Sequence, residues 1–404
     1  MKVLHVLETS APELVGYTIR GQYIVKHQRR SGLEPLVVTS PFFRGADGQR
    51  TDDIDGVQYF RSNHIPRPDK TQARPGAYWT RMNMVRRYRE FVAEVARSQR
   101  ADIIHAHSSY TNGIAARYAS KRLGIPFVYE LRTLWGERAV VEDGLSPTSI
   151  KYRLVWHLEL GVMRRANMVV AISRGIQDAI AERGIDVGKV VIVPNGVDTE
   201  VFVPRPPDGS LVEALDLAGC FVVGFIGSLG RLEGIALLIE AFGEVRRRQS
   251  RARLVIVGEG PERERLGKLV AAAGLSEVVR FTGLVPHDQI LRYYSVMDVL
   301  VYPRIDARIN QTVTPLKPLE AMAMGKTCLA SDVGGLKELV DDGVTGTLFA
   351  RGDVRDLTEK ILLLGSDRDL RDRLSARAQV AVRRDREWSA IASRYADIYR
   401  RAGA

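Results

Sequence analysis

Two charged side chains stand three positions apart in one short stretch of the chain. Residues 312–326 read TVTPLKPLEAMAMGK, a pattern that predicts a short helix stopped by Gly325 in a left-handed conformation. Lys317 and Glu320 then share a face and lie roughly 4.5 Å apart along the helix axis. A phosphate at Lys317 would place an attached ribose near Glu320, whose carboxylate can accept from both ribose hydroxyls. The pair therefore predicts a nucleotide site, and a simple intrahelical salt bridge explains the spacing equally well.

The start of this predicted helix favours an anion. Pro315 and Pro318 fall before or within its first turn, where a missing N–H removes only a donor that has no intrahelical partner. The remaining N–H groups and the positive end of the helix dipole attract negative charge, and Lys317 adds a full positive charge at the same place.

A glycine-rich turn forms a second candidate phosphate site. In FVVGFIGSLGRLEGIALLIEA a strand ends at Gly227, a turn follows, and an amphipathic helix begins after Gly234. Residues without a Cβ let backbone N–H groups approach a phosphate closely. Arg231 could also bind a diphosphate with two hydrogen bonds. Taken alone, such a turn fits a plain chain reversal as well.

Short apolar strands alternate with helical patterns along the whole chain, which predicts an α/β fold with parallel sheets. The strand-like runs are KVLHVLE, PLVVTS, DIIHAH, PFVYEL, MVVAIS and VVIVPNG, then FVVGFIG, RLVIVGEG, VVRFTG, DVLVYP, KTCLAS and TGTLF. A Pro/Gly-rich stretch near residue 200 separates the two series. At 404 residues, two domains are expected. We predict domains at 1–200 and 201–380, and a last helix within 381–404 that packs back toward the first domain.

Ligands of such sheets bind at the carboxyl ends of the strands, so function is expected in the loops that follow them and in a cleft between the domains. The last helix has an apolar stripe of Trp388, Ile391, Tyr395 and Ile398, which indicates packing.

The net charge of +11 indicates an anionic partner, such as a phosphorylated small molecule, nucleic acid or an acidic membrane. Residues 74–100 contribute to it by mixing aromatic, methionine and arginine side chains, which fits either a solvated helix face or a surface for a phosphate-bearing or membrane-embedded substrate. The side chains are Tyr78, Trp79, Arg81, Met82, Met84, Arg86, Arg87 and Arg89. No run of about 18 apolar residues is present, and the N-terminus does not resemble a signal peptide, so we expect a cytoplasmic protein. Cys220 and Cys328 are expected to be reduced core residues.

The motifs above, together with VPNGVD, VGEGPE, FTGLVPHDQI and SDVGGLKELV, resemble the retaining nucleotide-sugar glycosyltransferases of the family 4 group, which have the two-domain GT-B fold. The resemblance covers essentially the whole chain. It implies that the second domain binds a nucleotide sugar and that Glu320 contacts the ribose. Residues 283–285 are implied to meet the base through their backbone. The implied donor-binding residues are Gly16, Gly227, Ser228, Gly258, Glu259, Gly283, Val285, Thr312, Leu316 and Glu320.

Four positions depart from the family pattern. Thr312 stands where a second glutamate usually faces the donor sugar, and Ser228 and Glu233 stand where an arginine and a lysine are usual. The N-terminal double glycine is Val15-Gly16 here. We hypothesise that Arg231 and Lys317 take over the diphosphate charge.

The resemblance also implies the chemistry of the transfer. Such enzymes need no metal or other cofactor, and cations stabilise the departing diphosphate. Retention is attributed to front-face attack, in which the donor phosphate accepts the proton of the acceptor. The second histidine of DIIHAHSSY, His107, is implied to lie near the donor sugar, so His107, Arg231 and Lys317 are the catalytic candidates. We expect His105 and His107 to face opposite ways, one of them in the core. Glu130 and Arg132 fit either an acceptor site or a buried ion pair.

The sequence thus predicts a cytoplasmic enzyme that moves a sugar from a UDP-linked donor to a glycan or a lipid-diphosphate-linked acceptor. The basic helices of the first domain suggest a peripheral location on the inner membrane face. A sugar-nucleotide epimerase or hydrolase of the same fold is the first alternative, although no carboxylate pair for it is evident. A nucleic-acid-binding protein is less well supported, because no binding signature for nucleic acid appears. A nicotinamide enzyme is excluded by GEGPER, which lacks the third glycine of that fingerprint.

Overall fold

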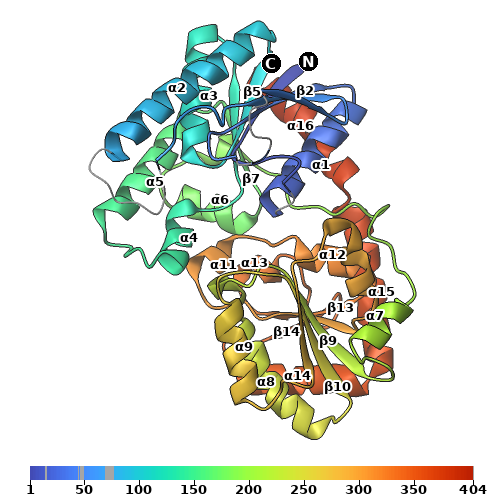
Figure 1. The fold of residues 1–404 in the computed structure, drawn as a ribbon. Helices are drawn as coiled ribbons and strands as arrows, with labels where there is room; N and C mark the ends of the chain where they lie inside the picture. Colours follow the sequence, from blue (N-terminus) through green and yellow to red (C-terminus); the bar gives the residue numbers. More distant parts are fainter. Residues whose placement is uncertain (14–15, 44, 46–49, 69–76, 404) are drawn as a thin grey trace. The chain divides into compact units, whose positions relative to one another are not determined.

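The computed structural model describes residues 1–13, 16–43, 45, 50–68 and 77–403, and these divide into two compact units (Figure 1). Unit 1 comprises 1–138, 145–194 and 388–404, and unit 2 comprises 139–144 and 195–387. Apart from the short segment 139–144, the chain leaves unit 1 after Pro194 and returns to it at Trp388.

In the described residues, unit 1 contains an eight-stranded sheet of order β3-β4-β2-β1-β5-β6-β7-β8, parallel except for the antiparallel pairing of β3 with β4. The strands are β1 (Lys2–Leu7), β2 (Glu34–Thr39), β3 (Thr51–Ile54), β4 (Val57–Arg61), β5 (Ile103–His107), β6 (Phe127–Leu131), β7 (Met168–Ala171) and β8 (Val190–Ile192). The helices are α1 (Gly16–Arg30), α2 (Ala77–Ser98), α3 (Tyr110–Leu123), α4 (Trp135–Glu142), α5 (Ile150–Met163), α6 (Arg174–Ala181), the 3₁₀ turn η1 (Val187–Lys189) and α16 (Trp388–Ala402).

Unit 2 contains a six-stranded parallel sheet, again counted in the described residues, of order β11-β10-β9-β12-β13-β14. Its strands are β9 (Phe221–Ile226), β10 (Ala252–Val257), β11 (Val279–Gly283), β12 (Val299–Tyr302), β13 (Thr327–Ser331) and β14 (Thr347–Phe349). Its helices and 3₁₀ turns are α7 (Gly209–Ala214), η2 (Arg231–Glu233), α8 (Ile235–Arg248), α9 (Arg263–Ala272), η3 (His287–Gln289), α10 (Ile290–Ser295), α11 (Arg308–Thr312), α12 (Lys317–Ala323), α13 (Gly334–Lys337), α14 (Val354–Ser366) and α15 (Arg368–Asp385).

Both faces of the second sheet are buried, as parallel sheets require. Successive residues of β9 point to opposite sides: Val222 and Ile226 belong to the apolar cluster with α12 and α15, and Val223 and Phe225 to the cluster with α8, α9 and α14. This explains the uninterrupted apolar run FVVGFI of β9. The predicted strand pattern is confirmed, whereas the β3–β4 hairpin was not predicted.

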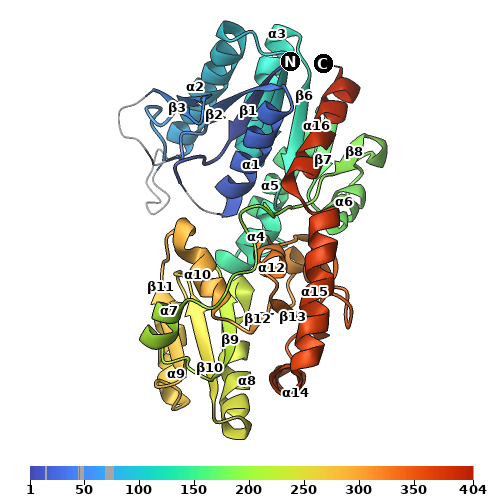
Figure 2. The ribbon, with the colours of Figure 1, turned by 90° about the vertical axis from the view of Figure 1, so that its right-hand side faces the viewer.

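The last helix packs on unit 1. Helix α16, red in Figures 1 and 2, contacts α1 and β6. Trp388, Ile391, Tyr395 and Ile398 are all buried, which confirms the predicted packing stripe.

Each sheet has a point where the strand order reverses. In unit 1, β2 lies on one side of β1 and β5 lies on the other side. In unit 2, β9 and β12 are neighbours, with β10 on the far side of β9 and β13 on the far side of β12. Ligands of open α/β sheets bind at the carboxyl ends of the strands at such a point. A ligand site is therefore expected at the loops after β1 and β5 and at the loops after β9 and β12.

Candidate active site

Three predicted glycines meet at the carboxyl edge of the second sheet. The N–H of Gly227 donates to the carbonyl of Val257 at 3.0 Å, and the N–H of Gly258 donates to the carbonyl of Gly283 at 3.0 Å. Gly258 has φ +136°, and a Cβ built on it would lie 1.8 Å from the carbonyl oxygen of Gly227. Only glycine fits there, so the loops after β9, β10 and β11 are held together by close backbone contact. Glu259, which follows Gly258, is exposed beside them.

Helix α12 carries the lysine and glutamate of the opening motif. It spans Lys317–Ala323, and Gly325 has φ +68°, which confirms the predicted helix and its stop. The Nζ of Lys317 lies 2.8 Å from Oε2 of Glu320, so the intrahelical salt bridge is formed. The hydroxyl of Tyr294 donates to the same oxygen at 2.9 Å. Within the described part of the chain the other oxygen, Oε1, has no partner, although the Glu320 side chain is only 6% exposed.

A carboxylate fixed through one oxygen presents its other oxygen in a defined direction. Tyr302 strengthens the arrangement, because its hydroxyl donates to the carbonyl of Lys317 at 2.9 Å and ties the start of α12 to the end of β12. The salt bridge and a ribose contact at Glu320 are therefore compatible.

The remaining donor-site candidates of unit 2 differ in their exposure to solvent and in the contacts that their side chains already make. Thr312 is buried, and its hydroxyl donates back to the carbonyls of Arg308 and Ile309 at 3.0 and 3.2 Å. Ser228 is exposed. Arg231 is 65% exposed and makes a long ion pair, 3.8 Å from Nε to Oε1 of Glu262. Leu316 is the residue before the first turn of α12, and Val285 is half-buried in the loop after β11.

In unit 1, α1 begins at Gly16, whereas Val15 lies outside the described residues. The two predicted strand histidines, His105 and His107, lie on the same face of β5, with ring centroids 4.0 Å apart, and both are fully buried. The prediction that they face opposite ways was wrong, because residues two apart in a strand share a face.

A closed series of buried hydrogen-bonding groups, here called the polar ring, surrounds these histidines. It joins β1, α1, β5, β6 and α16. Arg132 contacts His107 at 2.6 Å, His107 contacts His5 at 3.0 Å, and His5 contacts Gln28 at 2.8 Å. Gln28 contacts Tyr399 at 2.7 Å, and Tyr399 contacts His105 at 2.8 Å. His105 contacts Glu130 at 3.4 Å, and Glu130 contacts Arg132 at 2.9 Å, which returns to the start. The 3.4 Å contact between Nε2 of His105 and Oε2 of Glu130 closes the ring but is not a hydrogen bond, so this buried nitrogen has no hydrogen-bond partner in the described residues.

The polar ring determines the tautomer of every imidazole in it. Two groups lie near Nδ1 of His107: Nη2 of Arg132 at 2.6 Å and Oε1 of Glu130 at 3.3 Å. A guanidinium can only donate, so the shorter contact makes Nδ1 the acceptor and places the proton of His107 on Nε2. That proton goes to Nδ1 of His5, whose own Nε2–H goes to Oε1 of Gln28. The amide of Gln28 donates to Tyr399, and the Tyr399 hydroxyl donates to Nδ1 of His105. All three imidazoles are therefore neutral, with the proton on Nε2.

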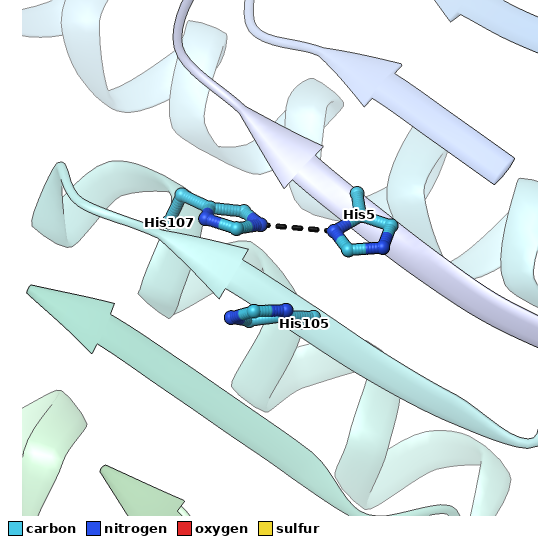
Figure 3. A group of neighbouring side chains, drawn as sticks. All are labelled: His5, His105 and His107. Atoms are coloured by element: carbon cyan, nitrogen blue, oxygen red, sulfur yellow. Dashed lines mark hydrogen bonds between the residues drawn. The ribbon is translucent and has the colours of Figure 1, made fainter. Parts of the chain in front are cut away.

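The three histidines also form a geometrically possible metal site. One nitrogen from each lies within 4.8 Å of the others, and Figure 3 shows the rings of His5 on β1 and of His105 and His107 on β5 turned toward one another. The donor set does not fit a cation, because every unprotonated nitrogen already accepts a hydrogen bond. The guanidinium groups of Arg20 and Arg132 are buried in the same network and would repel a metal ion.

Glu130 balances the two buried guanidinium groups. Its Oε1 lies 3.0 Å from Nε of Arg20 and 2.9 Å from Nε of Arg132, and its Oε2 accepts from the hydroxyl of Tyr395. Burial would raise the pKa of this carboxyl, but Arg20 and Arg132 hold it well below its ordinary value. Burial lowers the pKa of His5 to about 3, with the neighbouring His105 adding to the effect. Of the two interpretations of Glu130 and Arg132, the buried ion pair is the one observed.

Sequence reasoning missed His5, Gln28 and Tyr399, which lie far from DIIHAHSSY in the chain. It also misplaced one cysteine: Cys328 is buried in β13, but Cys220 precedes β9 and is only half-buried. It packs against the edge of the apolar core and also lines a polar surface hollow with Arg251 and Arg371, because β9 begins one residue later.

Known proteins share both the sequence and the architecture of this chain. The model of the family "Glycosyl transferases group 1" matches residues 218–380, and that of the "Glycosyl transferase 4-like domain" matches residues 16–196. The D-inositol 3-phosphate glycosyltransferase of Frankia alni is 30% identical over 336 residues, which cover 77% of this chain and 78% of the relative. The chain belongs to the group 1 glycosyltransferases.

Two further comparisons support this membership. The 2-deoxystreptamine N-acetyl-D-glucosaminyltransferase of Streptomyces fradiae is 29% identical over 335 residues, covering 81% of this glycosyltransferase and 77% of the relative. The crystal structure of Anabaena HepE in complex with UDP superimposes with a TM-score of 0.74 at 21% identity, covering 98% of this chain and 99% of that one. The glycosyltransferase therefore has the GT-B fold, which confirms the predicted fold class.

The described part of this group 1 glycosyltransferase contains no helix that is both long and apolar enough to span a bilayer. The two family matches divide it as the two units do: the 4-like match falls within the first sheet and its helices, and the group 1 match begins just before β9 and ends in α15.

Proposed function

We propose that this glycosyltransferase takes a sugar from a UDP-sugar bound to unit 2 and transfers it with retention of configuration. The observation that carries the proposal is the geometry of Glu320: one carboxylate oxygen is fixed by Lys317 and Tyr294, and the other has no partner in the described residues. Glu320 lies on α12, the helix that connects β12 to β13. This connection begins at β12, one of the two strands between which the strand order of the sheet reverses. Such an oxygen suits a ribose hydroxyl. HepE, which has the same fold, was crystallised with UDP and with UDP-glucose.

The proposed chemistry is electrostatic. Arg231 and Lys317 supply positive charge where the diphosphate leaves, and the donor phosphate accepts the proton of the acceptor, so no metal and no protein nucleophile is required. His107 is retained as a catalytic candidate on resemblance alone, because the polar ring occupies both of its nitrogens.

Nucleotide-dependent thermal stabilisation tests the donor assignment. UDP is expected to raise the melting temperature of the wild type, whereas GDP, ADP, NAD and short oligonucleotides have little effect. Glu320→Ala and Lys317→Ala should each abolish most of the UDP shift, and Lys317→Ala should also raise the donor KM and lower kcat. Lys268→Ala and Glu264→Ala are matched controls, because this pair forms a comparable helical salt bridge, 2.6 Å from Nζ to Oε1, on the exposed surface of α9.

Two outcomes would count against this donor assignment, and a third would count against transfer to an acceptor. Stabilisation by oligonucleotides alone would point to a nucleic-acid-binding protein, and a UDP shift unchanged in both site variants would remove Glu320 and Lys317 from the site. Consumption of the donor without any acceptor would favour the epimerase or hydrolase.

We further propose that the acceptor is a glycan or a lipid-diphosphate-linked sugar used in polysaccharide or glycoconjugate synthesis, reached at an acidic membrane surface. Helix α2 supports this proposal. Trp79 and Met82 are 74% and 53% exposed, and Arg81, Arg86 and Arg87 are exposed near them. Met84 packs inward, and the Tyr78 side chain lies outside the described residues. Exposed aromatic and basic side chains together suit the headgroup region of an anionic bilayer.

Vesicle flotation tests this surface. The protein is expected to float with phosphatidylserine-containing vesicles at low salt and to be released at high salt, because each basic residue near the surface contributes about 1 kcal/mol. Arg86→Gln/Arg87→Gln should weaken the binding, and the matched pair Arg383→Gln/Arg384→Gln, on the exposed face of α15, should not. Absence of flotation at low salt would refute the membrane proposal.

A further inference from the structure

Glu233 and Arg304 form an ion pair at the carboxyl edge of the second sheet. Glu233 lies in η2, after the glycine turn that follows β9, and Arg304 follows β12. Nε and Nη2 of Arg304 lie 3.2 and 2.7 Å from the two oxygens of Glu233, and the side chains are only 14% and 19% exposed. This is the bidentate geometry that guanidinium and carboxylate groups favour. The pair sits at the switch point between β9 and β12.

The backbones that carry the pair are fixed to each other. A Cβ on Gly234, which has φ +67°, would lie 1.9 Å from the carbonyl oxygen of Pro303, so the two loops touch where only glycine fits. The N–H of Ile305 donates to the carbonyl of Leu232 at 3.3 Å. The amide of Asn310 donates to both Leu232 and Ile305, at 2.9 and 3.0 Å. Arg304 is therefore held by its loop as well as by Glu233.

One edge of the guanidinium remains available. A guanidinium has five N–H donors arranged along two edges, each able to bind an oxyanion with two hydrogen bonds. Glu233 takes the edge formed by Nε and Nη2. In the described residues the other edge, formed by Nη1 and Nη2, has no protein acceptor.

The other basic side chains proposed for the donor site are less suitably placed to bind a diphosphate. Arg231 is 65% exposed, and Lys317 already contacts Glu320. We propose that Arg304, oriented by Glu233, is a diphosphate-binding residue of the donor site. This inference rests on the proposed function. It also gives Glu233 a role. The carboxylate of Glu233, in the loop after β9, orients the guanidinium of Arg304, which follows the neighbouring strand β12.

Binding of UDP and of uridine to Arg304→Gln tests the inference. Loss of a charge-assisted, bidentate contact is expected to weaken UDP binding tenfold or more and to leave the affinity for uridine unchanged, because uridine has no phosphate. The double variant Arg304→Gln/Glu233→Gln should recover part of this loss, since the unpaired carboxylate that repels the diphosphate is then removed. Arg304→Lys should not restore full binding, because an ammonium lacks the planar edge.

The matched control is Arg253→Gln. Arg253 is also ion-paired, 2.9 Å from Nη2 to Oδ2 of Asp216, and its side chain is 15% exposed, but it lies at the amino end of β10, on the opposite edge of the sheet. Its loss should leave UDP and uridine binding unchanged.

The outcomes separate this inference from the function on which it rests. If the wild type binds UDP but Arg304→Gln binds UDP normally, or a folded Arg304→Gln with the melting temperature of the wild type loses UDP and uridine in equal measure, the inference is wrong and the donor assignment stands. If the wild type binds no nucleoside diphosphate, both are wrong. Retained uridine binding shows that a variant is folded, and Arg304→Lys takes the place of Arg304→Gln if the latter does not fold.

Discussion

Replacement of Glu130 by alanine is expected to lower the free energy of unfolding of unit 1 by roughly 3–5 kcal/mol, because it removes the buried carboxylate that both Arg20 and Arg132 contact. Arg20 and Arg132 are only 3% and 4% exposed at the side chain and both contact Oε1 of Glu130. Neither guanidinium can lose its proton to escape the cost. Tyr395 and His105 would lose their carboxylate partner as well.

Urea denaturation followed by tryptophan fluorescence measures this effect on unit 1. The four tryptophans of the chain, Trp79, Trp135, Trp156 and Trp388, all lie in unit 1, so their fluorescence reports the unfolding of that unit.

Glu90→Ala is the control for Glu130→Ala. Glu90 also contacts an arginine and a tyrosine, Arg122 and Tyr118, but on the surface, where solvent screens the pair. A midpoint that moves equally little in both variants would mean that the polar ring does not stabilise unit 1.

Replacement of Glu159 by glutamine is expected to stabilise unit 1 increasingly as the pH rises. Glu159 lies on α5, is fully buried, and neither of its oxygens has a hydrogen-bond partner in the described residues. Burial raises the pKa of this carboxyl from 4.5 to about 8. In the unfolded chain it ionises near pH 4.5, so between pH 4.5 and 8 the folded state holds a proton that the unfolded state has released. Folding stability therefore falls as the pH rises through this window.

The size of the Glu159 effect follows from the width of the window. A shift of one pKa unit corresponds to 1.36 kcal/mol, so the advantage of Glu159→Gln should grow by roughly 3 kcal/mol between pH 5.5 and 8.5. The measurement is the difference in unfolding free energy between variant and wild type at several pH values. His5 has the opposite effect on stability: because its pKa is lowered in the folded state, stability falls as the pH drops below 6.5. This effect is the same in variant and wild type, so it cancels in the difference between their unfolding free energies. Glu94→Gln, on the exposed face of α2, is the control. A difference that does not change with pH would contradict the assignment.

The donor site shows how far local patterns extend. The helix of Lys317 and Glu320 and its stop at Gly325 were predicted correctly, because helix periodicity and a positive φ for glycine are properties of neighbouring residues. The same spacing could not distinguish a salt bridge from a ribose contact. That distinction depends on Tyr294, which reaches Glu320 from another helix and engages only one of the two oxygens.

The polar ring, in contrast, could not be predicted from local sequence patterns. His5 and His107 are 102 positions apart in the chain and become neighbours only because β1 pairs with β5. Tyr399 arrives from the last helix, 294 positions from His105. The ring, the neutral state of its histidines and the unpartnered carboxyl of Glu159 are all consequences of packing, and no short segment encodes them.

By itself, the sequence determined the alternation of strands and helices, the repetition of that pattern in two halves, the glycine turn after β9, the short helix α12 and the apolar stripe of α16. Each of these follows from hydrophobic periodicity or backbone preference within a few residues. The tertiary structure alone decided which charges meet: Glu130 with Arg20 and Arg132, and Glu233 with Arg304. The reason is that an ion pair depends on the distance between side chains, and strand order rather than chain position sets that distance.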